Sequence, residues 1–300
     1  MNTSEPIICG VDGSAGSGRA AVTARAISAG LRCPLVLVHV VPPRPPMPLA
    51  SVPVGGHPVG TAQMAELNRL ESEEAFAAVA DELADTDAEQ ITEHGFAPER
   101  FSAIAETRNA RLIVVGTRGI GAARSALLGS VSQELAACAS RPVLVVPELE
   151  RLATAGALGP GPVVCGVDGS DGAQAAARVA ARMADDLHLA LTLVSVRDPQ
   201  PNGDDFGAGL ATIARITPVG DHIERLAVSG EPAEALTRAA SDRNAALLVL
   251  GSRGRGPFRA ALLGSVSARV TRLADRPVLI VPPGAASEHV QRDMRSDPTG

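Results

Sequence analysis

Short aliphatic runs alternate with longer amphipathic segments along the whole chain. The runs lack the polar alternation of half-buried strands, so they predict strands buried on both faces. The segments between them repeat apolar residues at helical spacing and predict helices, such as those at 17–32, 61–84 and 130–138. Together they predict an α/β fold in which helices cover both faces of a parallel sheet. In the first half the predicted strands are PIICGVD, PLVLVHVV, AEQITEH, RLIVVG and PVLVVP.

The third of these runs, AEQITEH at 88–94, is unusually polar for a buried strand. Its counterpart IERLAVS at 223–229 is more apolar and predicts a strand more clearly. This strand therefore departs from the aliphatic composition that predicts the other strands of the first half.

The pattern occurs twice because the chain is a tandem duplication. ICGVDGS at 8–14 returns as VCGVDGS, RPVLVVP at 141–147 returns as RPVLIVP, and ALLGSVS at 126–132 returns unchanged. The loop GTRGIGAARSALLGS at 116–130 matches GSRGRGPFRAALLGS at 251–265 at ten of fifteen positions. These blocks keep the same order in both halves, which is typical of duplicated domains.

The repeats predict domains at 1–148 and 162–283, a linker at 149–161 and a polar tail at 284–300. The interval from Asp12 to Gly116 is 104 positions, against 83 from Asp168 to Gly251. Most of the difference lies in and after the Pro- and Gly-rich stretch 42–60, which predicts a surface loop.

Composition excludes several classes of protein. All 27 basic residues are Arg and are scattered through a chain of net charge −6, so no nucleic-acid footprint is evident. No apolar run approaches the roughly 20 residues that a membrane span needs, and the N-terminus lacks the basic start of a signal peptide. The four cysteines form no CxxC pair, and as free thiols they fit a cytoplasmic location.

Catalytic and metal signatures are also missing. The six histidines show no metal spacing and no pairing between the repeats, which favours solvated or structurally satisfied side chains. The sequence contains neither a GxSxG nucleophile motif nor an HExxH helix. We therefore predict no catalytic residue and no protein metal site.

The repeated glycine loop is the strongest candidate for chemistry. It is not a Walker loop, because a chain without Lys cannot supply the lysine of GxxxxGK[ST]. It is not a dinucleotide fingerprint either, because Arg124 stands where the third glycine should be and the loop follows the fourth strand. Glycines that let the backbone approach a ligand, followed by a helix start, still suit an anion.

Ser130 and Ser265 stand where the next helix begins, so their hydroxyls could cap it. Arg118 and Arg253 could supply the cation that the missing lysine does not. The alternative is that the glycines only form a tight turn. Likewise, Asp12 and Asp168, in the string DGS, could serve as turn residues, a role compatible with ligand binding.

The pattern Gly-x-x-Gly, nine residues, Gly-Ser, met in both halves, resembles the ATP-binding signature of the universal stress protein family. The GVDGS strands and the closing RPVLVVP strands resemble that family too, so nearly the whole chain is similar to its tandem members in actinobacteria. The resemblance implies two Rossmann-like domains of the adenine nucleotide α-hydrolase type, each a five-stranded parallel sheet of order 3-2-1-4-5. It also implies that the closing strands of the two halves pair as an internal pseudo-dimer, and it permits a further homodimer.

By resemblance, ATP, with Mg²⁺ bridging its phosphates, would occupy both halves. Asp12 and Asp168 would face the ribose. The ends of the second strands, at Val40 and Val196, would contact the adenine, and each of these valines lies 28 positions after the aspartate of its half. The glycine loops and helix starts would hold the phosphates. The implied site residues are Asp12, Val40, Val41, Gly116, Arg118, Gly119, Gly121, Gly129, Ser130, Val131 and Ser132, and Asp168, Val196, Arg197, Gly251, Arg253, Gly254, Gly256, Gly264, Ser265, Val266 and Ser267.

The function implied is a nucleotide-dependent regulator of stress response or growth arrest, with an unidentified protein partner and at most slow ATP hydrolysis. Two alternatives stay open. One is a nucleotide-dependent enzyme, an adenylyl transferase or ATPase, and the other is a scaffold with vestigial sites. The loops also differ in Ala122 and Ala123 against Pro257 and Phe258, so the two sites could differ in affinity.

Overall fold

The computed structural model describes residues 5–44, 61–117, 129–148, 158–197, 223–254 and 263–282. The predicted linker at 149–161 lies mostly outside these ranges, as does the predicted tail at 284–300. No helix within the described ranges is long and apolar enough to cross a membrane.

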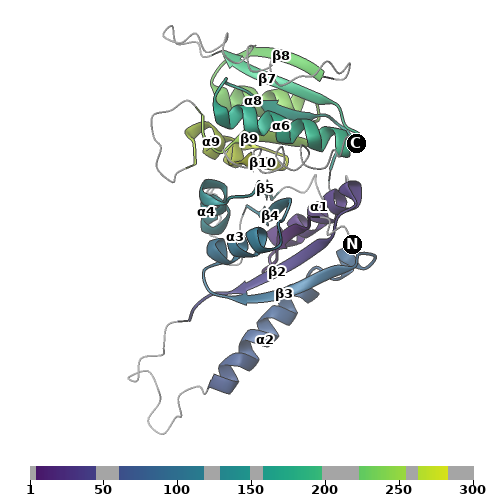
Figure 1. The fold of residues 1–300 in the computed structure, drawn as a ribbon, viewed down its shortest axis with the longest axis vertical. Helices are drawn as coiled ribbons and strands as arrows, with labels where there is room; N and C mark the ends of the chain where they lie inside the picture. Colours follow the sequence, from purple (N-terminus) through teal and green to yellow (C-terminus); the bar gives the residue numbers. More distant parts are fainter. Residues whose placement is uncertain are drawn as a thin grey trace, which may run out of the picture.

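The first half alternates strands and helices as the pattern predicted (Figure 1). Its elements in chain order are β1 (Ile7–Gly10), α1 (Ala15–Leu31), β2 (Leu35–Val41), α2 (Thr61–Ala77), the 3-10 turn η2 (Asp81–Leu83), β3 (Ala88–His94), α3 (Ala97–Thr107), β4 (Leu112–Gly116), α4 (Ser130–Cys138) and β5 (Val143–Val146). The helix predicted over 61–84 ends at Ala77, and the 3-10 turn takes up the remainder.

The second half repeats this order. Its described elements are β6 (Val163–Gly166), α6 (Asp171–Asp186), β7 (Leu191–Arg197), β8 (Ile223–Ser229), α8 (Pro232–Asp242), β9 (Leu247–Gly251), α9 (Ser265–Leu273) and β10 (Val278–Val281). Serines cap the first helix of each half: the Ser14 hydroxyl accepts from the Ser17 amide, and the Ser170 hydroxyl accepts from the Ala173 amide.

All ten described strands form one sheet, in the order β3-β2-β1-β4-β5-β10-β9-β6-β7-β8. Pairing within each half is parallel, in the order 3-2-1-4-5 that the resemblance implied. The halves join where β5 meets β10 in antiparallel register, with Leu144 opposite Leu279. The closing strands therefore pair inside one chain, as expected for an internal pseudo-dimer, and neither is left as an open edge.

The antiparallel junction places equivalent helices of the two halves on the same face of the sheet, since α1 and α6 contribute residues to one core. One continuous core lies on the α1 and α6 side and includes Ile7, Leu112, Val163 and Leu247. Two separate cores lie on the opposite face, one under α3 and α4 and the other under α8 and α9. The central strands β1, β4, β5, β6, β9 and β10 are buried on both faces, which explains their continuous aliphatic runs.

The polar run at 88–94 is a strand after all, and its position explains its composition. β3 and β8 form the two outer edges of the sheet, and they share the same sequence of exposed and half-buried residues. An edge strand presents one side to water, so charged and polar residues are tolerated there.

Candidate functional site

The turn after the first strand of each half is built around an aspartate. The Asp12 Oδ1 atom accepts bonds from the Ser14 amide at 3.0 Å and the Ser14 hydroxyl at 2.6 Å. In the second half, the Asp168 Oδ1 atom accepts from the Ser170 amide at 2.9 Å and the Ser170 hydroxyl at 2.6 Å. Both aspartates thus have the turn role that DGS suggested, with one carboxylate oxygen committed to it.

The glycine between each aspartate and serine is required by backbone geometry. Gly13 has φ +79° and Gly169 has φ +87°, a left-handed conformation that side chains with a Cβ rarely adopt. The turn therefore presents the aspartate at the carboxyl end of the first strand in both halves.

The first glycine of each repeated loop has a packing role that the sequence did not reveal. A Cβ on Gly116 would lie 2.7 Å from the carbonyl of Gly16 in α1, and a Cβ on Gly251 would lie 2.7 Å from the carbonyl of Gly172 in α6. A helix start and a strand end therefore touch through two glycines. The signal was present, since Gly16 and Gly172 each stand four positions after the aspartate.

The second glycine of the second loop brings that loop to the aspartate. A Cβ on Gly254 would lie 2.9 Å from Asp168 Oδ2, so a hydrogen at this position keeps room for the carboxylate. The predicted residues Asp168, Gly251 and Gly254 are thus gathered at the carboxyl ends of the neighbouring strands β6 and β9. The predicted Arg118, Gly119, Gly121 and Gly256 lie outside the described residues.

The base of each loop is closed by hydrogen bonds. The Gly129 amide donates to the Thr117 carbonyl at 2.6 Å, and the Gly264 amide donates to the Ser252 carbonyl at 2.9 Å. The Ser267 hydroxyl also donates to the Gly251 carbonyl at 2.7 Å. In the first half, the Ser132 hydroxyl donates to the Thr117 carbonyl at 3.2 Å, one position further along than the equivalent of Gly251. The last predicted serine of each half therefore bonds to the base of its loop.

The prediction that Ser130 and Ser265 cap their helices with their hydroxyls is wrong. The caps are Gly129 and Gly264, which have no side chain to bond with, and each serine is the first helical residue. The serines are exposed. The amides of Ser130, Val131 and Ser132 precede the first intrahelical bond, which Gln133 donates to Gly129, so they lie at the positive end of the helix.

The ends of the second strands complete the carboxyl edge. The Val41 carbonyl accepts from the Gly95 amide at 3.0 Å, and the Arg197 carbonyl accepts from the Gly230 amide at 3.2 Å. Val40 and Val196, one position earlier, are half-buried. These four residues belong to β2 and β7, which pair with β1 and β6, the strands that precede the aspartate turns.

All four cysteines lie in the described part of the chain, and none of them forms a disulfide. Cys9 and Cys165 are buried in equivalent strands, and burial raises the pKa of both thiols well above the ordinary range. The described residues contain no group of three His, Cys, Asp or Glu side chains suited to a metal ion.

His39 is a buried residue whose surroundings the sequence did not predict. Its side chain is 4% exposed, and its Nδ1 atom lies 2.9 Å from the Val11 carbonyl oxygen. Its ring meets the ring of Phe76 edge-on, at a centroid distance of 6.4 Å.

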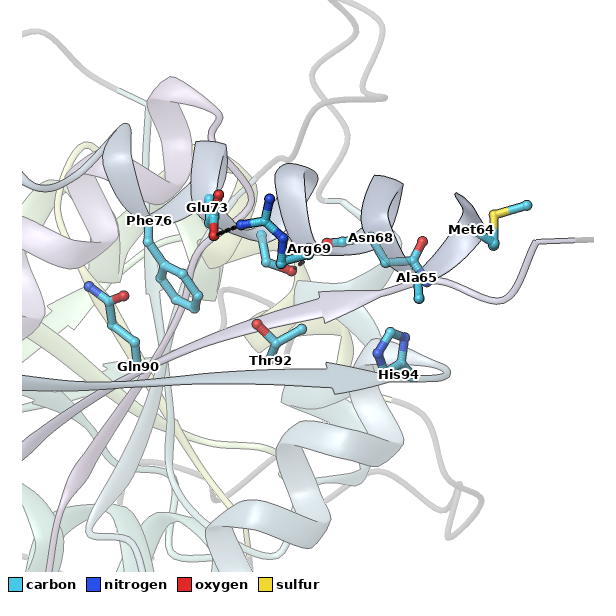
Figure 2. Close-up of a pocket in the computed structure, with 10 residues that line it drawn as sticks. Met64, Ala65, Asn68, Arg69, Glu73, Phe76, Gln90, Thr92 and His94 are labelled. Atoms are coloured by element: carbon cyan, nitrogen blue, oxygen red, sulfur yellow. Dashed lines mark hydrogen bonds and ion pairs between the residues drawn. The ribbon is translucent and has the colours of Figure 1, made fainter. Parts of the chain in front are cut away.

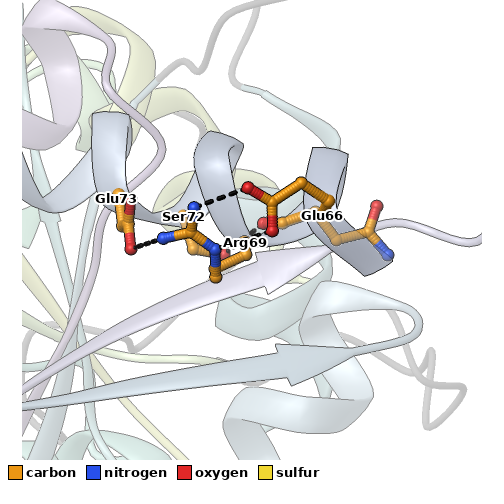
Figure 3. Close-up of polar contacts among 5 residues, drawn as sticks. Glu66, Arg69, Ser72 and Glu73 are labelled. Atoms are coloured by element: carbon orange, nitrogen blue, oxygen red, sulfur yellow. Dashed lines mark hydrogen bonds and ion pairs between the residues drawn. The ribbon is translucent and has the colours of Figure 1, made fainter. Parts of the chain in front are cut away.

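A groove of about 630 Å³ runs between α2 and β3, and Phe76 is one of the residues that line it. Figure 2 shows Gln90, Thr92 and His94 pointing from β3 toward the helix, while Phe76 points from the helix toward the strand. Arg69 on the helix side is held between Glu66, at 2.6 Å, and Glu73 (Figure 3). The Arg69 hydrogen bond lowers the pKa of Glu66. Because two carboxylates flank this arginine, the groove does not offer a free positive charge to an anion.

The chain is similar in sequence to a known protein family over most of its length. The family model of the universal stress protein family matches residues 3–147, 161–215 and 208–282. A universal stress protein of Mycolicibacterium smegmatis is 35% identical, covering 92% of this chain and 97% of its own length. Universal stress protein Rv2005c of Mycobacterium tuberculosis is 30% identical over 91% of this chain and 96% of its own.

The fold is also shared with a solved structure. The crystal structure of a universal stress protein from Archaeoglobus fulgidus has a TM-score of 0.71 at 21% identity, covering 94% of this chain and 99% of that one. At this level of identity the likeness concerns the tandem fold alone.

Proposed function

Because the chain belongs to the universal stress protein family, we propose that it binds ATP in both halves and acts as a nucleotide-dependent regulator of stress response or growth arrest. The two binding units are residues 1–148 and 162–283. The proposed location is the cytoplasm, where the buried free thiols Cys9 and Cys165 stay reduced.

One observation carries the proposal: the approach of Gly254 to Asp168. This contact joins the turn after β6, the first strand of the second half, to the loop after β9, the fourth strand. β9 is the neighbour of β6 on one side, and β7, the second strand, is its neighbour on the other. In open α/β sheets, ligands bind at such a switch in strand order, outside the carboxyl ends of the strands.

The distribution of charge supports a nucleotide with its phosphates toward the helix start. Unpaired amides at a helix N-terminus attract anions, and α9 begins at Ser265, directly after the loop that contacts Asp168. Asp168 would then face the ribose hydroxyls, for which a carboxylate is a suitable acceptor. The neighbouring Arg253 adds a positive charge to the same loop.

Magnesium fits this arrangement through the nucleotide. Mg²⁺ keeps several waters and is commonly bound by one or two carboxylates together with substrate phosphates. The described residues hold no ready cluster of three acidic, His or Cys ligands, so the phosphates would supply much of the coordination. Bound there, the ion would neutralise the phosphate charge.

Hydrolysis of the nucleotide is proposed to be slow. A general base must reach the attacking water and be available to accept its proton. The Oδ1 atoms of Asp12 and Asp168 each already accept two hydrogen bonds from the serine two positions later. These carboxylates are fixed turn acceptors, which suits ligand positioning better than proton transfer.

ATP binding at the helix starts is tested by introducing a negative charge there with substitutions that preserve the fold. Ser130→Glu and Ser265→Glu put a carboxylate at exposed first positions of α4 and α9, where an acidic residue favours the helix but repels phosphate. Calorimetric titration with ATP and Mg²⁺ should show at least about a tenfold loss of affinity in the altered half, or about 1.4 kcal/mol.

The matched controls are Ser130→Gln and Ser265→Gln, which add similar bulk without charge. They should bind ATP nearly as the parent does. Equal affinity of the Glu and Gln variants would place the phosphates elsewhere. Steady release of pyrophosphate or of phosphate at a rate typical of enzymes would favour the enzymatic alternative.

A further inference from the structure

The two halves differ at one buried position directly beneath the aspartate turn. His39 is the fifth residue of β2, and Ser195 is the fifth residue of β7. Both side chains are buried, with 4% and 1% exposed. The duplication therefore preserved the backbone while the side chain at this position became different in size and chemistry.

The His39 side chain ties the end of β1 to β2. β1 ends at Gly10, and the carbonyl of Val11, the next residue, lies 2.9 Å from His39 Nδ1. A carbonyl oxygen only accepts, so this bond requires the proton on Nδ1. Asp12 follows Val11 directly, so the bond fixes the backbone at the entrance to the turn.

The same imidazole also contacts α2. Its ring meets Phe76 at an interplanar angle of 75°, the edge-on arrangement that aromatic pairs prefer. One residue earlier in α2, Ala75 lies beside the turn, because a Cβ on Gly13 would be 3.7 Å from the Ala75 Cα. The imidazole and the helix thus support the Asp12 turn from two sides.

Ser195 makes no such tie in the second half. Within the described part of the chain, its buried hydroxyl oxygen has no hydrogen-bond partner. The buried Nε2 atom of His39 is likewise without one, so the bond to Val11 is the polar contact that accounts for the orientation of the ring.

We propose that His39 is a positioning residue that holds the Asp12 turn in its ligand-ready form, and that its replacement by Ser195 makes the two nucleotide sites unequal. The second part rests on the proposed nucleotide function, while the first is independent of it. A preorganised site loses less free energy to ordering when it binds. The first site should therefore depend on the residue at position 39.

Two variants of His39 separate the hydrogen bond from packing. His39→Leu keeps apolar bulk against Phe76 and removes the donor, whereas His39→Asn places an amide donor near the position of Nδ1. Ser195→Ala is the matched control, because it removes a hydroxyl for which the described residues show no partner.

The first readout is amide hydrogen exchange without added nucleotide, at Ser14, which donates to Asp12, and Ser170, which donates to Asp168. In His39→Leu, exchange at Ser14 should rise about 2- to 10-fold, the range for loss of one net hydrogen bond. Exchange at Ser170 should not change. His39→Asn should restore the Ser14 rate, and Ser195→Ala should alter neither amide.

The second readout is ATP affinity of the first half in a Ser265→Glu background. His39→Leu should weaken it by a similar 2- to 10-fold and His39→Asn should restore it. Unchanged Ser14 exchange in a folded His39→Leu protein overturns the positioning role. If exchange responds but the Ser265→Glu parent binds no ATP, the proposed nucleotide function of the first half fails while the positioning role stands.

Discussion

Asp168 and Gly254 lie against each other, and a methyl group on the glycine would come within 2.9 Å of the carboxylate oxygen Oδ2. The aspartate lies in the turn after the first strand of the second half, and the glycine belongs to the loop after the fourth. Residues 86 positions apart in the chain therefore meet at one edge of the sheet. This contact connects the repeated sequence motifs to a single site.

Gly254→Ala should weaken ATP binding in the second half by about 10-fold while leaving the first half unchanged. The added methyl must displace Asp168, whose Oδ1 atom is held by Ser170. Because the crowded atom lies at the end of a side chain, the fold should survive with a small loss of stability. Titration in the Ser130→Glu background isolates the second site, and an unchanged affinity there would contradict a role for this contact.

Gly251→Ala and Gly116→Ala should destabilise the protein by about 1–3 kcal/mol, the usual cost of overpacking. Each methyl would meet backbone of the neighbouring helix at 2.7 Å, which cannot move as a side chain can. Urea denaturation followed by circular dichroism measures the change in the free energy of unfolding.

Gly18→Ala serves as the matched control for these two variants. It lies within α1, and a Cβ there meets nothing within 4 Å. Alanine favours a helix over glycine by roughly 0.5–1 kcal/mol, so this variant should be more stable than the parent. Equal effects of all three substitutions would show that the approach of α1 and α6 to the strand ends is not tight.

Two equivalent ion pairs should give the protein a small stability dependence in acid. Arg108 bonds to Glu89 at 2.7 Å, and Arg243 bonds to Glu224 at 2.6 Å. The arginine hydrogen bonds lower the pKa of both glutamates. A lowered folded-state pKa means that the stabilisation is present above the unfolded value of 4.5 and is lost as the pH falls below it.

The double variant Glu89→Gln with Glu224→Gln should be less stable than the parent at pH 7 by about 0.4–2 kcal/mol, from roughly 0.2–1 for each exposed pair. The difference should shrink below pH 4.5. Denaturation curves at pH 7 and pH 3.5 measure it, and a difference that stays constant with pH would show that these pairs do not contribute.

The sequence predicted most of the fold because its signals were local and repeated. Aliphatic runs identified the central strands, and the shared blocks identified the duplication. The polar composition of Ala88–His94 obscured an edge strand, because its character depends on its position in the sheet, which the local sequence does not carry.

The candidate site was predicted in its residue types but less well in their roles. The family resemblance implied that Asp168 and Gly254 belong to one site, whereas the contact of Gly251 with the backbone of Gly172 was not predicted, although both halves have a glycine four positions after the aspartate. Ser265 looked like a cap, but the helix begins one residue earlier than a cap at Ser265 would require, because Gly264 is the cap. The place of His39 could not be predicted, because its partners Val11 and Phe76 come together only in the folded chain.

The most direct test of the central claim is the number of adenine nucleotides bound per chain. The protein has no Trp and no Tyr, so bound nucleotide dominates its absorbance at 260 nm. The protein would be saturated with ATP and Mg²⁺, freed of excess ligand and denatured, and the released nucleotide quantified beside the double variant Ser130→Glu with Ser265→Glu. The account predicts close to two nucleotides per chain, lost in the double variant. No nucleotide in the parent would contradict it and leave the glycine loops as turns of the fold.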